Sequence, residues 1–281
     1  MEFPRLRRTR LAPRALRLKL MSELHYPNLR HYAEENIANL LFVTVSGAHL
    51  YGFPSPDSDV DLRGTFAAPL SEVLSLDKPR ETLEPEGVVG GVEVELVGHE
   101  IEKYLRLLVK PNGYVLEQIC SPLVVLTSRW HEELKALALA GLSKRLYHHY
   151  AGFARGEWRE YQRPGAGKTV KRLLYLHRVL MTGIVLLTEG IVEANLHELN
   201  KRFALELDSL MAMKTRELAD ITGDDTPYVQ NITALFEQLE SVYAQSSLPD
   251  EVLNRTAISD FLVRVRLHHV TEDIYAVRTT Y

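Results

Sequence analysis

The sequence predicts an α+β fold, in which a mixed β-sheet flanked by helices is followed by an all-helical region. Three patterns carry this prediction. Apolar residues recur at three- and four-residue steps over 28–41, which is typical of a helix with one apolar face. Polar and apolar residues alternate over 59–63 and 92–97, which indicates half-buried strands. Beyond about residue 126 only long amphipathic helical patterns remain.

The elements of the sheet-forming half follow in chain order. An apolar, β-branched run at 41–45 predicts a buried strand, and Ser46-Gly47 at its end predicts a tight turn. The segment 52–58 is rich in Gly, Pro and Ser, as expected of a loop. The remaining predicted elements of this half are strands at 59–63 and 92–97 and helices at 98–109 and 114–120.

The second half shows helical periodicity and no strand pattern. Its predicted helices span 129–139, 142–161, 168–188, 227–244 and 249–270. We therefore expect a basic extension at 1–21, a catalytic domain at 22–125, and a helical domain at 126–281 that closes a cleft against it.

The composition is that of an ordinary globular protein, with 46% hydrophobic and 25% charged residues in a chain of 281. Cys120 is the single cysteine, so no internal disulfide can form, and a reducing, cytoplasmic location is expected. No apolar run approaches the roughly 18 residues that span a membrane. The formal net charge of -4 argues against a protein that coats nucleic acid through net charge alone.

Residues 1–20 form a basic arm in which the only acid is Glu2. The arm fits a nucleic-acid-binding tail, an arginine-rich targeting segment, or an upstream extension ahead of a start at Met21, of which the last is preferred. Its cations are Arg5, Arg7, Arg8, Arg10, Arg14, Arg17 and Lys19.

Two aspartates carry the chemistry of the sheet-forming half. Asp59 and Asp61 lie two residues apart on a predicted strand, so both carboxylates project from one face. Hard oxygen ligands suit Mg²⁺ or Mn²⁺, and two such ions roughly 3.5 to 4 Å apart can bind the attacking and leaving oxygens of a phosphoryl transfer. A solvated Asx-type turn is the alternative, and the adjacent glycine turn favours the metal site.

The turn at Ser46-Gly47-Ala48 offers backbone amides and one hydroxyl. Because Gly47 has no side chain, a triphosphate can approach the backbone there. The turn, the strand before it and the aspartate pair therefore form one unit that predicts a nucleotide-binding site.

The motif Gly47-x-x-x-Tyr51-Gly52, followed by Pro56-Asp-Ser-Asp-x-Asp-Leu-Arg-Gly64, resembles nucleotidyltransferases of the DNA polymerase beta superfamily. In particular, it is similar to a bacterial and phage branch associated with RNA repair. The resemblance implies transfer of a nucleoside monophosphate from an NTP to an acceptor hydroxyl, with release of pyrophosphate. It also implies three carboxylates on the sheet and a helical wall across the cleft.

The resemblance implies that Asp59 and Asp61 bind two metal ions, while a third carboxylate holds only the catalytic ion and helps to deprotonate the acceptor hydroxyl. Glu93 and Glu95 share one strand face, and Glu95 is preferred as the third carboxylate because of its distance to the following helix. Either glutamate taken singly is also explained as a solvated strand acid.

The motif departs from the family at one position, where Gly47-Ala48 stands in place of Gly-Ser. The phosphate-binding hydroxyl must therefore come from Ser46 or Ser58, or be replaced by backbone amides. Arg63, inside the same motif, is a further candidate for nucleotide binding.

The stretch 144–178 is strongly basic and contains interleaved aromatic residues, which fits binding of a triphosphate and an oligonucleotide. Solvated helix faces explain most of its cations equally well. Lys171, Tyr175 and Arg178 fall on one helix face, and Arg178 lies in an apolar run where an unpaired charge is costly. A triphosphate is predicted to be its partner. Lys144, Arg155 and Arg159 are predicted to contact RNA.

Three other motifs are set aside. His148-His149, and His268-His269 with Glu272 and Asp273, lack an evident third metal ligand. The segment 165–169 resembles a phosphate loop but lacks its first glycine and a preceding strand. Cys120 is expected to be a small core residue rather than a nucleophile.

Three functions stay open at this point. The acceptor is an RNA 3′ end, which the resemblance favours, or it is a protein side chain or small molecule, or the protein is a non-catalytic nucleotide-binding module. All the acid positions of the motif are filled, which disfavours the last. The oligomeric state and the preferred NTP are not predicted.

Overall fold

The structure is a computed structural model that describes residues 26–164, 168–216, 221 and 223–278. The basic arm lies outside the described residues. The strands are β1 Leu40–Val45, β2 Val60–Phe66, β3 Thr82–Leu83, β4 Glu86–Val89, β5 Val92–Glu100 and β6 Val124–Leu126. The helices around them are α2 Tyr26–Asn36, α3 Gly47–Tyr51, α4 Leu70–Leu74, α5 Ile101–Val109 and α6 Gly113–Cys120.

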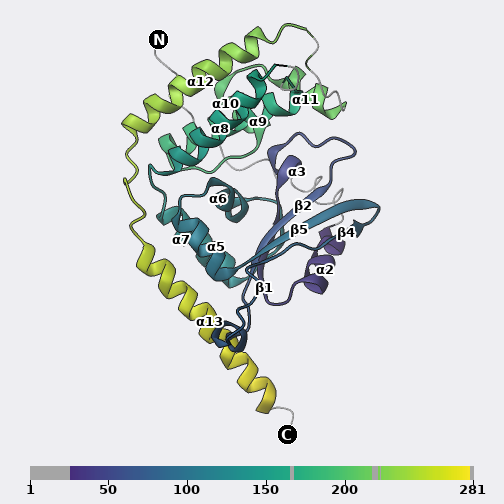
Figure 1. Cartoon of the computed structure of the whole chain (residues 1–281), viewed down its shortest axis with the longest axis vertical. Helices are drawn as coiled ribbons and strands as arrows, with labels where there is room; N and C mark the ends of the chain where they lie inside the picture. The colour runs from purple at the N-terminus through teal and green to yellow at the C-terminus, as the bar shows by residue number, and fades with distance from the viewer. Residues whose placement is uncertain (1–25, 165–167, 217–220, 222, 279–281) are drawn as a thin grey trace.

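The helices that follow β6 make up most of the second half. They are α7 Arg129–Ala140, α8 Leu146–Gln162, α9 Val170–Glu189, α10 Leu196–Phe203, α11 Asp208–Thr215, α12 Thr226–Gln245 and α13 Arg255–Arg278. In Figure 1, α8 to α12 lie above the sheet, whereas α13 runs down past α7 and α5. The predicted α+β class, with a mixed sheet followed by helices, is confirmed.

The described strands form one mixed sheet in the order β3-β5-β2-β1-β6, with β4 also paired to β5. β1 runs antiparallel to both β2 and β6, while β2 and β5 run parallel. The parallel register places Asp61 beside Glu95 and Gly64 beside Gly98. The two predicted acid-bearing strands are therefore neighbours at the centre of the sheet.

Helix α2 covers one face of the sheet. Leu29, Ala33 and Ile37 recur at helical spacing and are buried there. They form one core cluster with apolar residues of the three central strands, among them Val43, Val45, Val60, Leu62, Val94 and Leu96.

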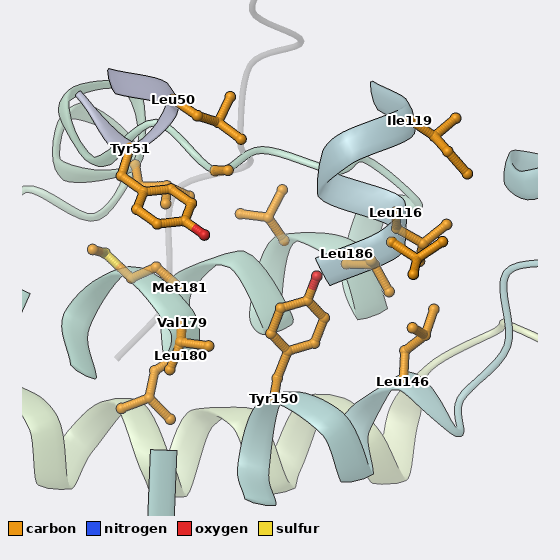
Figure 2. Close-up of a cluster of buried hydrophobic side chains, with 14 of the residues drawn as sticks. Leu50, Tyr51, Leu116, Ile119, Leu146, Tyr150, Val179, Leu180, Met181 and Leu186 are labelled. Carbon is orange, nitrogen blue, oxygen red and sulfur yellow. The ribbon is translucent and has the colours of Figure 1, made fainter. Parts of the chain in front are cut away.

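The other face of the sheet shares its core with the helical half. Helix α9 lies at the centre of this core, because α8, α10, α11 and α12 all pack against it. Figure 2 shows side chains of α3, α6, α8 and α9 meeting in one cluster, with Tyr51, Leu116, Tyr150 and Leu186 among them. One hydrophobic core thus crosses the expected boundary between residues 125 and 126, and the division of the chain there stays a prediction.

Helix α13 returns to the sheet-forming half and packs against α4, α5 and α7. Its Arg266 forms a buried ion pair with Glu100 at 2.5 Å. Glu100 also accepts a hydrogen bond from the Glu102 amide at 2.8 Å and so caps the N-terminus of α5. Helices α7 and α13 thus pack beside β1 and α5, and the closing of a cleft by the helical half stays a prediction.

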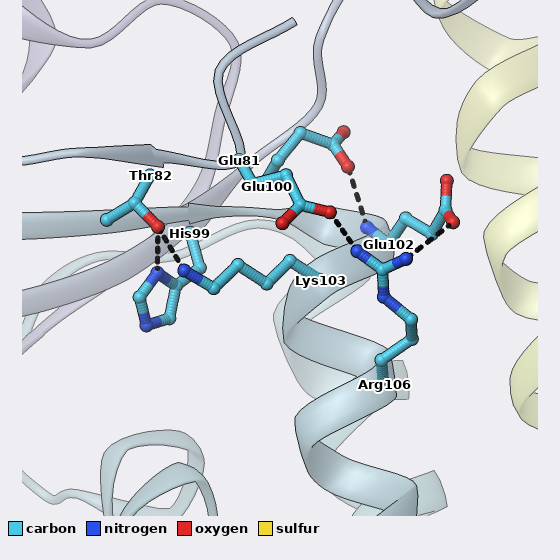
Figure 3. Close-up of polar contacts among 7 residues, drawn as sticks. All are labelled: Glu81, Thr82, His99, Glu100, Glu102, Lys103 and Arg106. Carbon is cyan, nitrogen blue, oxygen red and sulfur yellow. Dashed lines mark hydrogen bonds and ion pairs between the residues drawn. The ribbon is translucent and has the colours of Figure 1, made fainter. Parts of the chain in front are cut away.

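A polar network joins the edge strand β3 to β5 and α5. Thr82 contacts the Nδ1 atom of His99 at 3.0 Å and accepts a hydrogen bond from Lys103, while Arg106 pairs with Glu81 (Figure 3). Burial and, to a smaller extent, the positive charges of Lys103 and Arg63 lower the pKa of His99 to about 4. His99 therefore contributes to this network as a neutral ring.

Several element boundaries differ from the predictions. The helix expected at 98–109 begins at Ile101, because Gly98 to Glu100 extend β5 and pair with β2. The helix expected at 28–41 ends at Asn36, and Leu40 and Leu41 belong to β1. The helices expected from residues 142 and 249 begin at Leu146 and Arg255. β3, β4, β6, α3, α4, α10 and α11 were not predicted.

Candidate metal and nucleotide site

Three carboxylates converge where β2 and β5 lie side by side. Asp59 directly precedes β2, and Asp61 lies beside Glu95 in the parallel pair. One ligand atom from each of Asp59, Asp61 and Glu95 lies within 4.8 Å of the other two. We call these three residues the acidic triad. Glu93 is exposed and is not a member of this group.

Gly47 leaves the room that the Asp61 carboxylate needs to reach the other members of the acidic triad. A Cβ atom at residue 47 would lie 1.8 Å from Oδ2 of Asp61, and Gly47 has a φ of 57°. Both the close approach and the left-handed backbone require glycine. The turn and the acidic triad are therefore one packed unit, as the motif predicted.

Arg63 lies on the same face of β2 as Asp61. Its Nη2 atom is 2.7 Å from Oδ1 of Asp61 and 3.5 Å from Oε2 of Glu95. Burial is the main reason that the pKa of Asp61 is raised, and Asp59 and Glu95 raise it further while Arg63 lowers it. One guanidinium thus offsets only part of the charge of three carboxylates.

The acidic triad borders a hollow of about 480 Å³ beside β4 and β5. Three carboxylates that offer oxygen ligands within a few ångströms fit Mg²⁺ or Mn²⁺. The hollow is lined by Asp59, Glu86, Gly87, Val88, Glu93, Val94 and Glu95.

The predicted turn at Ser46-Gly47-Ala48 is the start of the short helix α3. The Ser46 amide donates to the Asp61 carbonyl at 2.8 Å, so this amide is already used within the protein. The Ser46 hydroxyl makes no capping hydrogen bond to α3. This leaves the amides of Gly47 and Ala48 at the first turn of the helix, where backbone N–H groups have no partner within the helix.

Ser58 braces the loop that precedes Asp59. Its hydroxyl accepts a hydrogen bond from the Ser55 amide at 2.9 Å and lies 3.1 Å from the Ser55 hydroxyl. Lys214 of α11 donates to that same Ser55 hydroxyl at 2.5 Å. Helix α11 therefore contacts the loop, and a contact of Ser58 with nucleotide stays a prediction.

Lys171 and Tyr175 lie on the face of α9 that turns toward the sheet. The Lys171 ammonium is 5.9 Å from the centroid of the Tyr175 ring, and that ring meets Tyr51 edge-on at 5.6 Å. Burial raises the pKa of Tyr175, and the charges of Asp61 and Asp59 raise it further while Arg178 lowers it. Tyr175 is therefore close enough to the acidic triad to feel its charge.

Arg178 has a protein partner, contrary to the prediction. It is fully buried, and its Nη1 atom lies 3.0 Å from Oε1 of Glu117 in α6. Its guanidinium also lies 3.7 Å from the centroid of the Tyr51 ring. The sequence could not show this pair, because 61 residues separate its members. We correct the role of Arg178 from a nucleotide ligand to a buried link between α9, α6 and α3.

The basic stretch 144–178 is largely neutralised by ion pairs, most of them with acids from elsewhere in the chain. Lys144 pairs with Asp250, and Arg155 pairs with Glu240. Within the described residues, all cations of the stretch except Arg159 and Lys171 form ion pairs. The other pairs are Arg145–Glu251, Arg163–Glu160, Lys168–Asp225, Arg172–Glu157 and Arg178–Glu117.

The motifs set aside above add little to the site. Burial raises the pKa of Cys120 to about 11, which keeps this thiol protonated. Within the described residues, no metal-binding group includes His148 or His149. Residues 165–167 and the side chains of 269–278 lie outside the described residues.

The sequence assigned no role to His49, Tyr51 or Glu117. His49 lies on α3, where burial lowers its pKa and the charges of Asp61 and Asp59 act in the opposite direction. Its place two residues after Gly47, inside the motif, was the available signal. Tyr51 and Glu117 meet Arg178 only through the tertiary fold. Within the described residues, no helix is both long enough and apolar enough to cross a membrane.

The chain is similar to proteins in three comparisons. An uncharacterized protein of Methanocaldococcus jannaschii is 36% identical over 157 residues, which are 53% of this chain and 61% of that protein. An uncharacterized protein of Bacillus subtilis is 27% identical over 144 residues, which are 50% of this chain and 54% of that protein. These alignments thus span less than two thirds of either relative.

A crystal structure of a nucleotidyltransferase-like protein from Exiguobacterium sibiricum aligns with 79% of this chain and 75% of that chain, at 13% identity and a TM-score of 0.32. The model of the RNA repair pathway DNA polymerase beta family matches residues 21–264, which include the glycine turn, the acidic triad and nearly all of the helical half. This chain belongs to the RNA repair pathway DNA polymerase beta family.

Proposed function

We propose that this protein is a metal-dependent nucleotidyltransferase that transfers a nucleoside monophosphate from an NTP to an acceptor hydroxyl and releases pyrophosphate. One observation carries the proposal, namely that Asp59, Asp61 and Glu95 converge against the glycine turn at Gly47. Divalent ions, Mg²⁺ or Mn²⁺, would neutralise the triphosphate and polarise the α-phosphate at this place. Membership of the family supports the same reaction class.

Each member of the acidic triad has a distinct role in this proposal. Asp59 and Asp61 would hold both ions, and Glu95 would hold the catalytic ion and accept the proton of the acceptor hydroxyl. The acceptor oxygen forms a bond to the α-phosphorus, and the bond from that phosphorus to the bridging oxygen breaks, so pyrophosphate leaves. Positioning and charge neutralisation supply most of the rate.

The nucleotide is held between the α3 turn and α9. The Gly47 and Ala48 amides and the Ser46 hydroxyl face the phosphates from the sheet side. Lys171 and Tyr175 approach from α9, and their closeness to Tyr51 at the end of α3 supports this arrangement. On the sheet side we also assign Arg63 and Ser58 to nucleotide binding. Arg63 would move from Asp61 to a phosphate as metal ions enter.

The acceptor in this proposal is the 3′ hydroxyl of an RNA, either a tRNA or a broken RNA end. The family description, which places these proteins in RNA repair, supports this assignment. The single cysteine supports a cytoplasmic location for the reaction.

The decisive experiment incubates the protein with labelled NTPs and Mg²⁺ or Mn²⁺, in the presence of total RNA, of protein, or of neither. We expect label on RNA 3′ ends, and loss of about a thousandfold in rate for Asp59→Asn and for Asp61→Asn. Asp57→Asn is the matched control, because Asp57 is an exposed acid of the same loop. If the label appeared only on protein or on a small molecule, the assignment of RNA as the acceptor would be wrong. Metal-dependent transfer at the wild-type rate in the Asp59 or Asp61 variant would refute the site.

A further inference from the structure

A second hollow, of about 570 Å³, lies between α5, α8 and the start of α13. Its lining contains Val109 and Pro111 as apolar members, and no Asp or Glu is among the described residues that line it. The polar residues that line it are Arg106, Lys110, Arg145, His148, His149 and Arg255. We call this the basic hollow.

The basic hollow keeps an excess of positive charge after its ion pairs are counted. Arg106 pairs with Glu81 and Glu102, and Arg145 pairs with Glu251. Lys110 and Arg255 are exposed and form no ion pair within the described residues. The two free cations come from different elements, the end of α5 and the start of α13, so their charges converge only in the folded protein. Two solvated cations on the wall of one hollow attract an anion to it.

Aromatic side chains connect the basic hollow to the acidic triad. The His149 ring meets Tyr114 edge-on at 5.0 Å, and Tyr114 meets Phe153 at 5.7 Å. Burial raises the pKa of both Tyr114 and Tyr175 while the positive charge of Arg178 lowers both, and the centroid of the Tyr175 ring lies 5.8 Å from the Arg178 guanidinium. Tyr114 and Phe153 are only half-buried, so parts of both rings face solvent. Cations beside partly exposed aromatic rings are what single-stranded nucleic acid binds, through phosphate contacts and base stacking.

We propose that the basic hollow binds the phosphate backbone of a single-stranded RNA acceptor, a few nucleotides before the 3′ end that reaches the acidic triad. The direction of the strand rests on the proposed function, whereas the binding itself needs no catalysis. The volume and the four cations on three elements exceed what a single phosphate group requires. The site also differs from the basic stretch 144–178, because Arg106, Lys110 and Arg255 lie outside that stretch.

The test measures binding of a 5′-labelled RNA of about twelve nucleotides by fluorescence anisotropy, without NTP or metal. The variant carries Lys110→Glu with Arg255→Glu. The matched control carries Lys78→Glu with Arg80→Glu, which makes the same change in net charge at an exposed lysine and an exposed arginine that form no ion pair within the described residues. Both lie in the segment between α4 and β3. Circular dichroism and thermal unfolding check that both variants fold.

We expect the hollow variant to bind RNA roughly fivefold or more weakly than wild type, and the control to bind with nearly wild-type affinity. The slope of log affinity against log salt should become shallower by about 1.4 in the hollow variant, since each phosphate contact contributes about 0.7 for single strands. Equal losses in both variants, or an unchanged slope in the hollow variant, would overturn the proposal.

Two further measurements distinguish a failure of this proposal from a failure of the proposed function, and RNA binding from binding of a small anion. If wild-type protein labels no RNA but the hollow variant still binds RNA more weakly than wild type, RNA is not the acceptor, while the proposal that the basic hollow binds RNA is supported. If wild-type protein extends RNA and the hollow variant does so with an unchanged KM for RNA, the proposal that the basic hollow binds RNA is wrong and the proposed function stands. Displacement of the RNA by inorganic phosphate at an equal phosphate concentration would show a small-anion site and overturn the RNA proposal.

Discussion

Asp61 is constrained on several sides by its neighbours. Gly47 leaves room for its carboxylate, Arg63 pairs with it at 2.7 Å, and Glu95 lies beside it on the adjacent strand. A side chain held in this way keeps its position within the tolerance that the proposed metal-assisted transfer requires. Small changes at its neighbours should therefore affect the chemistry.

Gly47→Ala tests this constraint directly. The added methyl group would lie 1.8 Å from Oδ2 of Asp61, so the carboxylate must move. We expect transfer to fall about a hundredfold, with a loss of stability on the order of 1–2 kcal/mol from the left-handed backbone. The measurements are the transfer rate and urea unfolding.

The matched control is Gly91→Ala. Gly91 has a φ of 87°, and an added Cβ would meet nothing within 4 Å. This variant should carry a similar backbone cost and keep its transfer rate. Equal loss of transfer in both variants would assign the Gly47 effect to the backbone rather than to Asp61.

Glu95→Gln and Glu93→Gln separate the two glutamates of β5. Glu95 belongs to the acidic triad, and Glu93 is exposed at the edge of the hollow. We expect Glu95→Gln to lower the rate constant for chemistry about a hundredfold or more and to leave NTP affinity nearly unchanged, because its proposed role concerns the attacking oxygen. Glu93→Gln should be mild. Single-turnover kinetics with varied NTP give both quantities, and a reversed order would move the third carboxylate to Glu93.

At the scale of elements, α9 is tied to α6 and α3 by the Arg178–Glu117 pair. Both side chains are buried, and Nε and Nη2 of Arg178 and Oε2 of Glu117 have no hydrogen-bond partner among the described residues. An incompletely satisfied buried ion pair costs stability compared with apolar residues of similar volume. We interpret the pair as a link that sets the position of Tyr51 and, through α3, that of the glycine turn.

A double-mutant cycle measures this link. Arg178→Met and Glu117→Leu should each destabilise the protein by about 3–5 kcal/mol, because each leaves a buried charge without its partner. The double variant should be markedly more stable than the sum of the two losses predicts. Urea unfolding provides the free energies. Additive losses would show that the two charges do not depend on one another.

The strands and helices differ in how far the sequence could predict them. Alternation located β2 and β5, and an apolar run located β1, because each strand is long enough to show a pattern. β3 and β6 contain two and three residues, too few for any period to appear. Gly98 to Glu100 fit a helical pattern and are held in β5 by pairing with β2, which is a tertiary effect.

The candidate site divides in the same way. Asp59, Asp61 and Gly47 lie within one motif, so local spacing was enough to bring them together. Glu95 was favoured over Glu93, but alternation alone could not separate them because they share a strand face. Glu117, Glu240 and Asp250 reach their partners in the basic stretch through long-range packing, and a local charge count could not include them.

At the scale of the whole molecule, buried histidines make stability depend on pH. His177 is fully buried in α9, and burial lowers its pKa from 6.5 to about 4, while a hydrogen bond to the Leu173 carbonyl acts in the opposite direction. The unfolded chain therefore binds a proton more readily than the folded protein between these values. The contribution of neutral His177 to the free energy of unfolding is fully present above pH 6.5 and is lost as the pH falls toward 4.

His177→Gln removes this titration and keeps an amide that can donate a hydrogen bond. The wild-type free energy of unfolding should fall between pH 6.5 and 4, with His177 contributing up to about 3 kcal/mol of the loss. The variant should lose correspondingly less over the same range. Urea unfolding at several pH values measures both, and parallel curves for the two proteins would contradict the assignment.

The ion pair between Arg266 and Glu100 also affects how the protein is made. During translation the ribosome releases the sheet strands first, and Arg266 emerges 166 residues after Glu100. Until then Glu100 lacks its guanidinium partner, and the face of α5 that α13 covers stays open. A nascent chain can therefore pair β2 with β5 and assemble the acidic triad long before the C-terminal helix fastens the α5 side of the sheet. Chaperones that recognise unfinished chains would meet this protein with its acidic triad in place and the α5 side of the sheet uncovered by α13.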